Sequence, residues 1–251
     1  MRNMEKRYSA IIVAAGTGKR MNSSVKKQYI TISGFPVLYY TIKAFEESKV
    51  DDIIIVTGSD EIEYVKNDIV DKYGFNKIRA VCAGGRERCD SVYKGLQTLM
   101  EKTVPGYILI HDGVRPMITP SLINTCVEKV TEYEAVIPAI PEKDTVKEVN
   151  ADMEVAGTPD RKKLYRIQTP QCFKMELIGD AFEKFYKASG RFTKTGENTE
   201  EAGVSDSAAI TDDAMLVEKF TGHKIKIIEG DYKNIKITTP EDIALAEFYL
   251  M

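Results

Sequence analysis

The sequence predicts an α/β fold: a mostly parallel, Rossmann-like sheet with helices on both faces, plus an extended β-arm. Five short runs are nearly continuous in Val, Ile and Leu, which is typical of strands covered on both faces of a parallel sheet. Amphipathic helical segments alternate with these runs, and this rhythm favours a doubly wound sheet with right-handed crossovers. The predicted strands are Tyr8–Ala14, Ile53–Thr57, Ile78–Cys82, Tyr107–His111 and Ala135–Ile140.

Apolar stripes and caps predict the helices. Thr119 and Thr239 each precede a proline, which indicates an N-cap followed by the first helical position, and Asp242 adds an acidic residue to the second start. Residues spaced to lie on one helical face form two stripes. The stripes consist of Val92, Leu96, Leu99 and Met100, and of Leu122, Ile123, Cys126, Val127 and Val130.

Two stretches interrupt this rhythm. Residues 141–166 hold short strand-like pieces, Thr145–Val149 and Met153–Ala156, around polar turns, and we expect them to form an arm that leaves the sheet. Residues 189–206 are polar and glycine-rich, which predicts an exposed loop. Because neither stretch is typical of a linker between two cores, residues 1–251 predict a single domain with an arm.

The composition narrows the class of protein. The chain has 35 Lys and Arg against 38 Asp and Glu, a balance that argues against coating nucleic acid or binding a membrane surface. No apolar run is long enough to span a bilayer, and the first residues lack a signal-peptide cleavage pattern. The four cysteines form no C-x-x-C pair, which disfavours a disulfide framework or a zinc site. We therefore expect a cytoplasmic protein.

A glycine-rich turn follows the first predicted strand. In open α/β sheets ligands bind beyond the carboxyl ends of the strands, and here the segment Ala14-Ala15-Gly16-Thr17-Gly18-Lys19-Arg20 combines a tight turn with two cations. Walker and dinucleotide patterns are both absent, because Val13 and Met21 stand where each needs a glycine. Nearby Lys26 and Lys27 favour a phosphate pocket, whereas a solvated strand-to-helix turn is the alternative.

A second turn of the same kind follows the third predicted strand. Gly84-Gly85-Arg86-Glu87-Arg88 permits close backbone approach, and Asp90 or Ser91 can cap the helix that begins there. A purely structural turn explains this segment alone. It does not explain why two glycine turns with cations fall on one edge of the sheet.

The fourth predicted strand runs into His111-Asp112-Gly113-Val114-Arg115. A carboxylate at this edge is placed to hold Mg²⁺, and Arg115 to bind a phosphate, although an Arg–Asp ion pair without metal is the alternative. His111 has no nucleophile partner and is expected to pack or to support its neighbours. Further along, Lys236 is expected within an apolar strand, where it either reaches the site or faces water at an edge.

Taken together, the cations point to one chemistry. Several basic residues lie beside predicted strand ends, and Asp112, near the same edge of the sheet, is the single candidate metal ligand. Transfer of a phosphoryl-type group needs charge neutralisation and positioning and little covalent work by the protein. The basic residues are Lys19, Arg20, Lys27, Arg88, Arg115 and Lys236.

Eight motifs occur in the order found in 2-C-methyl-D-erythritol 4-phosphate cytidylyltransferases, and the sequence resembles that family from about Tyr8 to the end. They are A-A-G-T-G-K-R-M, K-K-Q-Y, G-G-R-E-R-C-D-S-V, H-D-G-V-R-P, D-T-V-K, Q-T-P-Q-C-F, I-T-D-D-A and N-I-K-I-T-T-P-E-D. The resemblance implies transfer of a cytidylyl group from CTP to 2-C-methyl-D-erythritol 4-phosphate. The products are 4-diphosphocytidyl-2-C-methyl-D-erythritol and pyrophosphate, in the non-mevalonate synthesis of isoprenoid precursors.

The resemblance also implies roles for single residues. Catalytic positions that stabilise charge at the α-phosphorus match Arg20, Lys27 and Lys236, and Arg161 is a further catalytic position on the substrate side. Nucleotide-binding positions match Ala14, Ala15, Gly16, Gly18, Lys19, Gly85, Arg88 and Ser91. Substrate-binding positions match Asp112, Arg115, Thr145, Arg161, Thr169 and Lys236, with Asp112 also near Mg²⁺. In this family the arm crosses to the other subunit, so a homodimer with shared sites is implied.

Three other functions remain open at this stage. A polyol-phosphate cytidylyltransferase, such as a ribitol 5-phosphate enzyme, would share the fold, but often has Ala-Gly-Gly after the first strand. A nicotinamide-dependent dehydrogenase is disfavoured by the missing third glycine, and a non-catalytic nucleotide sensor need not keep Lys27, Arg161 and Lys236 together. The sequence departs from the family's pattern at Arg86, where some relatives are acidic, and at Val25, where many have proline.

Overall fold

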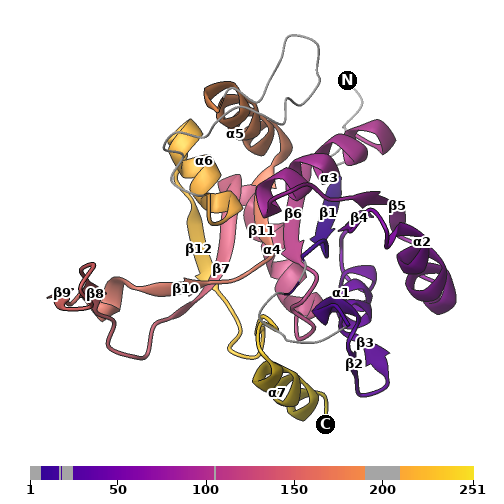
Figure 1. Ribbon diagram of the computed structural model, residues 1–251. Coiled ribbons are helices and arrows are strands. Elements are labelled where there is room, and N and C mark those ends of the chain that lie inside the picture. Colours follow the sequence, from indigo (N-terminus) through magenta and orange to yellow (C-terminus); the bar gives the residue numbers. More distant parts are fainter. Residues whose placement is uncertain (1–6, 17, 19–24, 105, 190–209) are drawn as a thin grey trace.

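The computed structural model describes residues 7–16, 18, 25–104, 106–189 and 210–251. In these residues the main sheet has eight strands in the order β10-β7-β11-β6-β1-β4-β5, with β12 also paired to β7 (Figure 1). The strands are β1 (Tyr8–Val13), β4 (Asp52–Thr57), β5 (Ile78–Ala83), β6 (Tyr107–Asp112), β7 (Ala135–Pro141), β10 (Tyr165–Ile167), β11 (Gln171–Lys174) and β12 (Lys226–Glu229).

The half of the sheet that carries the glycine turns is parallel. β1 pairs in parallel with both β4 and β6, and β4 with β5, whereas β11 lies antiparallel between β6 and β7. Val13 at the end of β1 stands opposite Val56 of β4 and Asp112 of β6. This register brings the segments after β1, β4 and β6 to the same edge, and the predicted mostly parallel α/β fold is confirmed.

Helices cover both faces because alternate strand residues point to opposite sides. Ala10 and Ile12 pack toward α1 (Val37–Glu46), α4 (Pro120–Tyr133) and the helix formed by α2 (Ile62–Tyr64) with its π-helical continuation Val65–Asp71. Ile11 packs on the other face, which is covered by α3 (Arg88–Lys102), α5 (Met175–Ala188) and α6 (Asp213–Thr221). The last helix, α7 (Pro240–Leu250), packs by Ala246 against a third apolar cluster near β2 (Thr31–Ile32) and β3 (Phe35–Pro36).

Most predicted caps and strands are confirmed, with small changes at the ends. Thr119 accepts a hydrogen bond from the Leu122 N–H at 3.2 Å, and Thr239 forms a capping box with Asp242. The predicted cap of α3 was wrong: Glu87 is the N-cap, and Asp90 completes a capping box from the third helical position. Met100 was also misassigned to the buried stripe, since it is 51% exposed at the end of α3.

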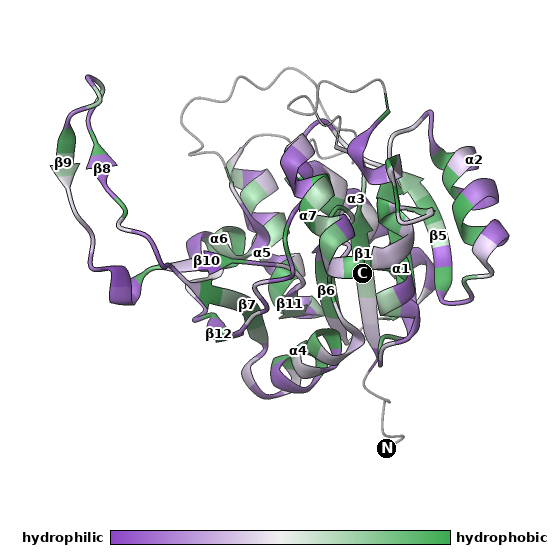
Figure 2. Ribbon diagram, turned by 90° about the horizontal axis from the view of Figure 1, so that it is seen from below, coloured by the Kyte–Doolittle hydropathy of each residue, from purple (hydrophilic) through white to green (hydrophobic). Residues whose placement is uncertain are grey.

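The arm leaves the body as predicted (Figures 1 and 2). Its hairpin pairs β8 (Glu148–Val149) with β9 (Val155–Gly157), so the two strands are shorter than the sequence suggested. A 3₁₀ turn at Arg161–Lys163 follows, and β10 then returns the chain to β7. The predicted loop at residues 189–206 lies outside the described residues from residue 190 onward. Among the described helices, none is long and apolar enough to cross a membrane.

Gly95 sets how closely α3 approaches the sheet. A Cβ added there would lie 2.8 Å from Ile11 Cγ2 on β1 and 2.9 Å from Val56 Cγ2 on β4, and β1 ends at the first predicted glycine turn. Gly179, in the middle of α5, would place a Cβ 3.9 Å from the nearest atom, the flexible end of Met175.

We therefore expect opposite effects from one substitution at two helical glycines. Gly95→Ala should lower the free energy of unfolding by about 1–3 kcal/mol through overpacking. Gly179→Ala should raise it by up to about 1 kcal/mol, because alanine favours the helix over glycine. Urea denaturation of both variants measures this difference, and equal effects at the two positions would contradict the packing argument.

Candidate active site

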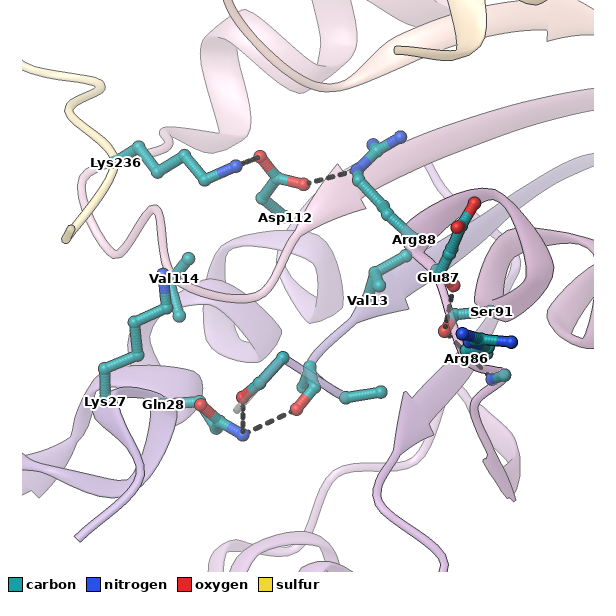
Figure 3. A pocket seen from close by; sticks show the side chains of 14 residues that line it. Val13, Lys27, Gln28, Arg86, Glu87, Arg88, Ser91, Asp112, Val114 and Lys236 are labelled. Atoms are coloured by element: carbon teal, nitrogen blue, oxygen red, sulfur yellow. Dashed lines mark hydrogen bonds and ion pairs between the residues drawn. The ribbon is translucent and has the colours of Figure 1, made fainter. Parts of the chain in front are cut away.

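A cavity of about 310 Å³ opens where β1, β5 and β6 end (Figure 3). Both glycine turns and the end of β6 contribute to its wall. Nine of the residues predicted from the sequence line it together: Ala14, Ala15, Gly16, Lys27, Gly85, Arg88, Ser91, Asp112 and Lys236. Lys19 and Arg20 lie outside the described residues, so their position stays a prediction.

The two glycine turns touch each other at the base of this pocket. A Cβ on Gly84 would lie 2.5 Å from the Ala15 Cβ, and one on Gly85 would lie 2.3 Å from the Asp90 Cβ. Ser91 Oγ accepts a hydrogen bond from the Gly85 N–H at 3.0 Å, which fixes the second turn to the start of α3. Glycine is therefore required at Gly84 and Gly85 by close approach of the neighbouring side chains.

Asp112 stands at the centre of a cluster of cations. Its Oδ1 lies 3.1 Å from Arg88 Nε, and its Oδ2 lies 2.9 Å from Lys236 Nζ and 3.7 Å from Arg115 Nε. Burial by itself would raise the pKa of Asp112, but the charges of Arg88, Lys236 and Arg115 outweigh it and hold that pKa well below its usual range. The carboxylate is therefore ionised throughout the physiological range of pH.

Arg88 is shared between two buried carboxylates. Its Nη1 lies 2.8 Å from Asp213 Oδ2 at the start of α6, while its Nε faces Asp112. Burial would lower the pKa of Arg88, but the two carboxylates reverse that effect and raise it. Asp213, 2% exposed, was not singled out from the sequence, although it lies in the I-T-D-D-A motif. The I-T-D-D-A motif, to which the sequence analysis gave no role, was the signal that could have pointed to Asp213.

Arg115 and Thr169 lie behind the pocket and hold the segment that carries Lys236. Arg115 Nη1 donates to the Asn234 carbonyl at 2.8 Å, and Asn234 Nδ2 donates to the Thr169 carbonyl at 3.0 Å. The prediction of a strand around Lys236 was wrong. Residues 230–239 form a loop without strand pairing. A backbone hydrogen bond of 2.9 Å, from the Ile237 N–H to the Val114 carbonyl, joins this loop to the turn that follows β6.

The K-K-Q-Y segment forms a short 3₁₀ turn, Lys27–Tyr29, beside the first glycine turn. Gln28, 1% exposed, donates from Nε2 to the carbonyls of Ala14 at 2.7 Å and Gly16 at 3.2 Å. Lys27 Nζ donates to the Ile237 carbonyl at 3.1 Å, next to Lys236 in the chain. Gln28 was missed as a site residue, because its role depends on backbone carbonyls that only the folded turn brings near.

Figure 3 shows that the pocket has two unlike sides. Lys27 and Lys236 lie on one side, and Arg86, Glu87 and Ser91 on the other. The first side offers cations that suit phosphates, whereas the second offers a backbone turn and mixed polar groups. Thr145 and Arg161 do not line this pocket: both are exposed on the arm, where Arg161 Nη1 donates to the Lys143 carbonyl at 2.7 Å.

The described pocket residues do not fit a metal ion held by the protein. Asp112 and Glu87 are the two carboxylates among the described lining residues. Both oxygens of Asp112 already face cations, and Glu87 accepts the capping hydrogen bond of α3. This arrangement is the Arg–Asp ion pairing that the sequence left open as the alternative, and it argues against direct ligation of Mg²⁺ by Asp112.

Comparison with known proteins identifies the chain. Residues 8–251 match the family described as IspD: 2-C-methyl-D-erythritol 4-phosphate cytidylyltransferase. A protein of that name from Lachnospira eligens is 46% identical over 96% of this chain and 98% of its own length. The crystal structure of 4-diphosphocytidyl-2C-methyl-D-erythritol synthase from Anaerococcus prevotii covers 98% of this chain and 96% of its own, with 38% identity and a TM-score of 0.78.

The chain belongs to this family. A further crystal structure, from Francisella tularensis, is 28% identical with a TM-score of 0.74 and covers 96% of this chain and 99% of its own. The predicted family, fold and reaction class are thereby confirmed, and the chain is a cytidylyltransferase that uses CTP. The match favours a methylerythritol phosphate enzyme over a ribitol phosphate cytidylyltransferase. It also favours an enzyme over a nucleotide sensor without activity.

His111, the second-last residue of β6, is fully buried. Its ring centroid lies 5.1 Å from that of Phe45, and its Nδ1 lies 3.0 Å from Thr169 Oγ1. Burial lowers the pKa of His111 to about 3, although the neighbouring Asp112 charge acts in the opposite direction. The imidazole is therefore neutral at physiological pH and supports the strand end rather than exchanging protons with substrate.

This burial predicts a pH-dependent stability. Below about pH 6.5 the unfolded chain protonates His111 while the folded chain does not, so stability falls as the pH falls. Between pH 7 and pH 5 this group should lower the free energy of unfolding by about 2 kcal/mol. In His111→Gln that part of the loss should disappear. Urea denaturation at pH 7 and pH 5 measures the free energy of unfolding of both proteins. An equal loss of stability between these pH values in the variant and the wild type would refute the role given to His111.

Proposed function

We propose that the enzyme transfers the cytidylyl group of CTP to 2-C-methyl-D-erythritol 4-phosphate at this pocket and releases pyrophosphate, with Arg20, Lys27, Arg161 and Lys236 neutralising the reacting phosphates. The observation that carries the proposal is the gathering of Lys27, Lys236 and Arg88 around one cavity with Asp112. The cytosine and ribose lie toward Gly85 and Ser91, in contact with the Ala14–Gly16 backbone. The triphosphate lies toward Lys27 and Gly18, and Lys19 is a further residue expected to bind it.

The reaction needs positioning more than proton transfer. A phosphate monoester is largely a dianion at neutral pH, because its second pKa is near 6, so its oxygen attacks the α-phosphorus without a general base. The new phosphorus–oxygen bond forms as the bond to the β-phosphate oxygen breaks, and pyrophosphate leaves with that electron pair. Two unit charges about 4 Å apart repel by about 4 kcal/mol at an effective dielectric of 20, and this repulsion is the part of the barrier that the cations lower.

Lys27 and Lys236 act as a pair in this step. The Lys27 ammonium bonds the carbonyl beside Lys236, so both cations approach the reacting phosphates from one side of the pocket. Asp112 holds Lys236 and Arg88 in place before the substrates bind. Arg115 and Thr169 act on the substrate side by fixing the loop that carries Lys236. Mg²⁺ has no direct ligand in this proposal among the described pocket residues, because both oxygens of Asp112 face cations.

The arm suggests that two chains complete each site. Thr145 and Arg161 match substrate-binding positions of the family, yet both are exposed far out on the arm and absent from their own chain's pocket. The arm also exposes apolar side chains, with Met153 77% and Val155 62% exposed. We therefore propose a homodimer in which each arm places Thr145 and Arg161 against the partner's pocket. Each chain then acts as one nucleotidyltransferase domain, and its four cysteines, which form no disulfide with one another, fit a reducing cytoplasm.

Removing the Lys27 ammonium should lower kcat by about 100- to 1,000-fold, because one preorganised charge at a developing anion has about that effect. The Lys27→Ala variant should keep its circular dichroism spectrum and melting temperature. Pyrophosphate release from CTP with methylerythritol phosphate measures the rate. Lys66→Ala, which alters an exposed lysine paired with Glu63, is the control. A near-normal rate for Lys27→Ala would end the assignment.

Mixing two inactive variants tests the shared site. Lys27→Ala damages the pocket and Arg161→Ala damages the arm, so a mixed dimer contains one intact site. After the two proteins are unfolded together and refolded, about a quarter of the wild-type activity should return, since half the dimers are mixed and each has one working site of two. If each pocket were complete within one chain, mixing would restore nothing.

A further inference from the structure

A buried carboxylate lies behind the K-K-Q-Y turn and outside the pocket. Glu61, 8% exposed, follows β4 at the end of the Gly58–Glu61 turn. Its Oε2 accepts hydrogen bonds from Thr57 Oγ1 at 2.9 Å, the Gly58 N–H at 3.0 Å and the Tyr29 hydroxyl at 3.0 Å. Its Oε1 lies 2.5 Å from Lys26 Nζ. Two residues of the K-K-Q-Y segment are thus tied to one carboxylate.

The two adjacent lysines of this segment have separate environments. Lys26 pairs with Glu61 and does not line the pocket, whereas Lys27 lines it and bonds the Ile237 carbonyl. Tyr29, two residues after Lys27, reaches the same carboxylate, and its hydroxyl also lies 2.7 Å from Thr57 Oγ1. Lys27 is therefore flanked in the chain by two residues that Glu61 holds.

The opposite side of the turn is held as well. Gln28 anchors the turn to the carbonyls of Ala14 and Gly16, and Lys27 packs its Cγ 3.5 Å from where a Cβ of Gly18 would lie. The turn is consequently fastened to the end of β4 on one side and to the first glycine turn on the other. With the backbone fixed at both sides, the direction of the Lys27 side chain is set before substrate binds.

The protonation states of the cluster favour this arrangement. Burial alone would raise the pKa of Glu61, but Lys26 and the three hydrogen-bond donors outweigh it and lower that pKa. Burial raises the pKa of the Tyr29 hydroxyl, which therefore remains a donor at neutral pH. An ionised acceptor facing these donors makes charge-assisted hydrogen bonds, which are stronger than neutral ones.

We infer that Glu61 is a positioning residue for Lys27: it holds Lys26 and Tyr29 so that the ammonium between them is presented to the reacting phosphates. It also neutralises Lys26, which leaves Lys27 as the lysine of the pair that meets the triphosphate. The inference rests on the proposed role of Lys27. Misplacing a catalytic group by about 1 Å costs about 100-fold in rate, so loss of this support has a measurable effect.

The test is a double-mutant cycle between Glu61 and Lys27. Glu61→Gln should lower kcat about 10- to 100-fold, with the KM for methylerythritol phosphate changed less than about twofold. In the Lys27→Ala background, the same change should lower the single-turnover rate less than about twofold, because the group it positions is gone. Tyr29→Phe, which keeps the ring and removes the hydrogen bond to Glu61, should lower kcat less than Glu61→Gln does and should likewise have little effect in the Lys27→Ala background. This variant replaces Glu61→Gln in the cycle if Glu61→Gln does not fold.

A matched control is available two residues away. Glu63 is exposed and pairs with Lys66 at 3.0 Å, so Glu63→Gln should leave kcat unchanged. The inference is overturned if Glu61→Gln keeps a kcat within twofold of wild type, or if it slows Lys27→Ala as much as it slows wild type. If Lys27→Ala itself retains full activity, the proposed function of Lys27 fails instead, and the two failures are thereby distinguished.

Discussion

The rim of the sheet depends on one buried carboxylate. Arg88, Arg115 and Lys236 converge on Asp112, with nitrogens 2.9–3.7 Å from its oxygens, and like charges gathered around one carboxylate repel one another. Asp112 offsets that repulsion because it contacts all three from a single position at the end of β6. The cations are therefore arranged before any polyanion arrives, and this preorganisation is what makes their charge useful in a transition state.

Hydrogen bonds behind the pocket keep this arrangement rigid. The Asn234 side chain and carbonyl join the Lys236 loop to Thr169 and Arg115, and Gln168 donates from Nε2 to the Asp231 carbonyl at 2.7 Å. The Arg115, Gln168, Thr169 and Asn234 residues are buried, so each of their polar groups left without a bond would carry the cost of its desolvation. The residues that hold this loop come from the turn after β6, the segment between β10 and β11, and the loop after β12 itself.

The sequence was most informative where burial and periodicity agree. The parallel strands are nearly uniform in Val and Ile because both of their faces are covered, and their ends could be aligned without knowing the register. Asp112 was found in this way, as the polar residue at which an apolar strand stops. Lys236 was misplaced because alternating isoleucines indicate a strand, whereas here the loop makes isolated contacts in place of a ladder.

Other features were invisible because they join distant residues. Arg88 meets Asp213 across 125 positions and Arg115 meets Asn234 across 119, and no local pattern reports such pairs. The cap of α3 was misjudged because Glu87 and Asp90 both suit that helix start, and only the folded turn shows which comes first. Met100 was misassigned because helical spacing predicts which face of α3 is apolar but not how far along the helix the sheet covers that face.

The bond from Lys27 to the carbonyl of Ile237 unites the two ends of the chain at the reacting centre. The glycine turns and the K-K-Q-Y segment leave the ribosome early, whereas the loop with Lys236 follows the last strand of the sheet. Any chain that stops before residue 236 therefore lacks both Lys236 and the carbonyl group that holds the Lys27 ammonium.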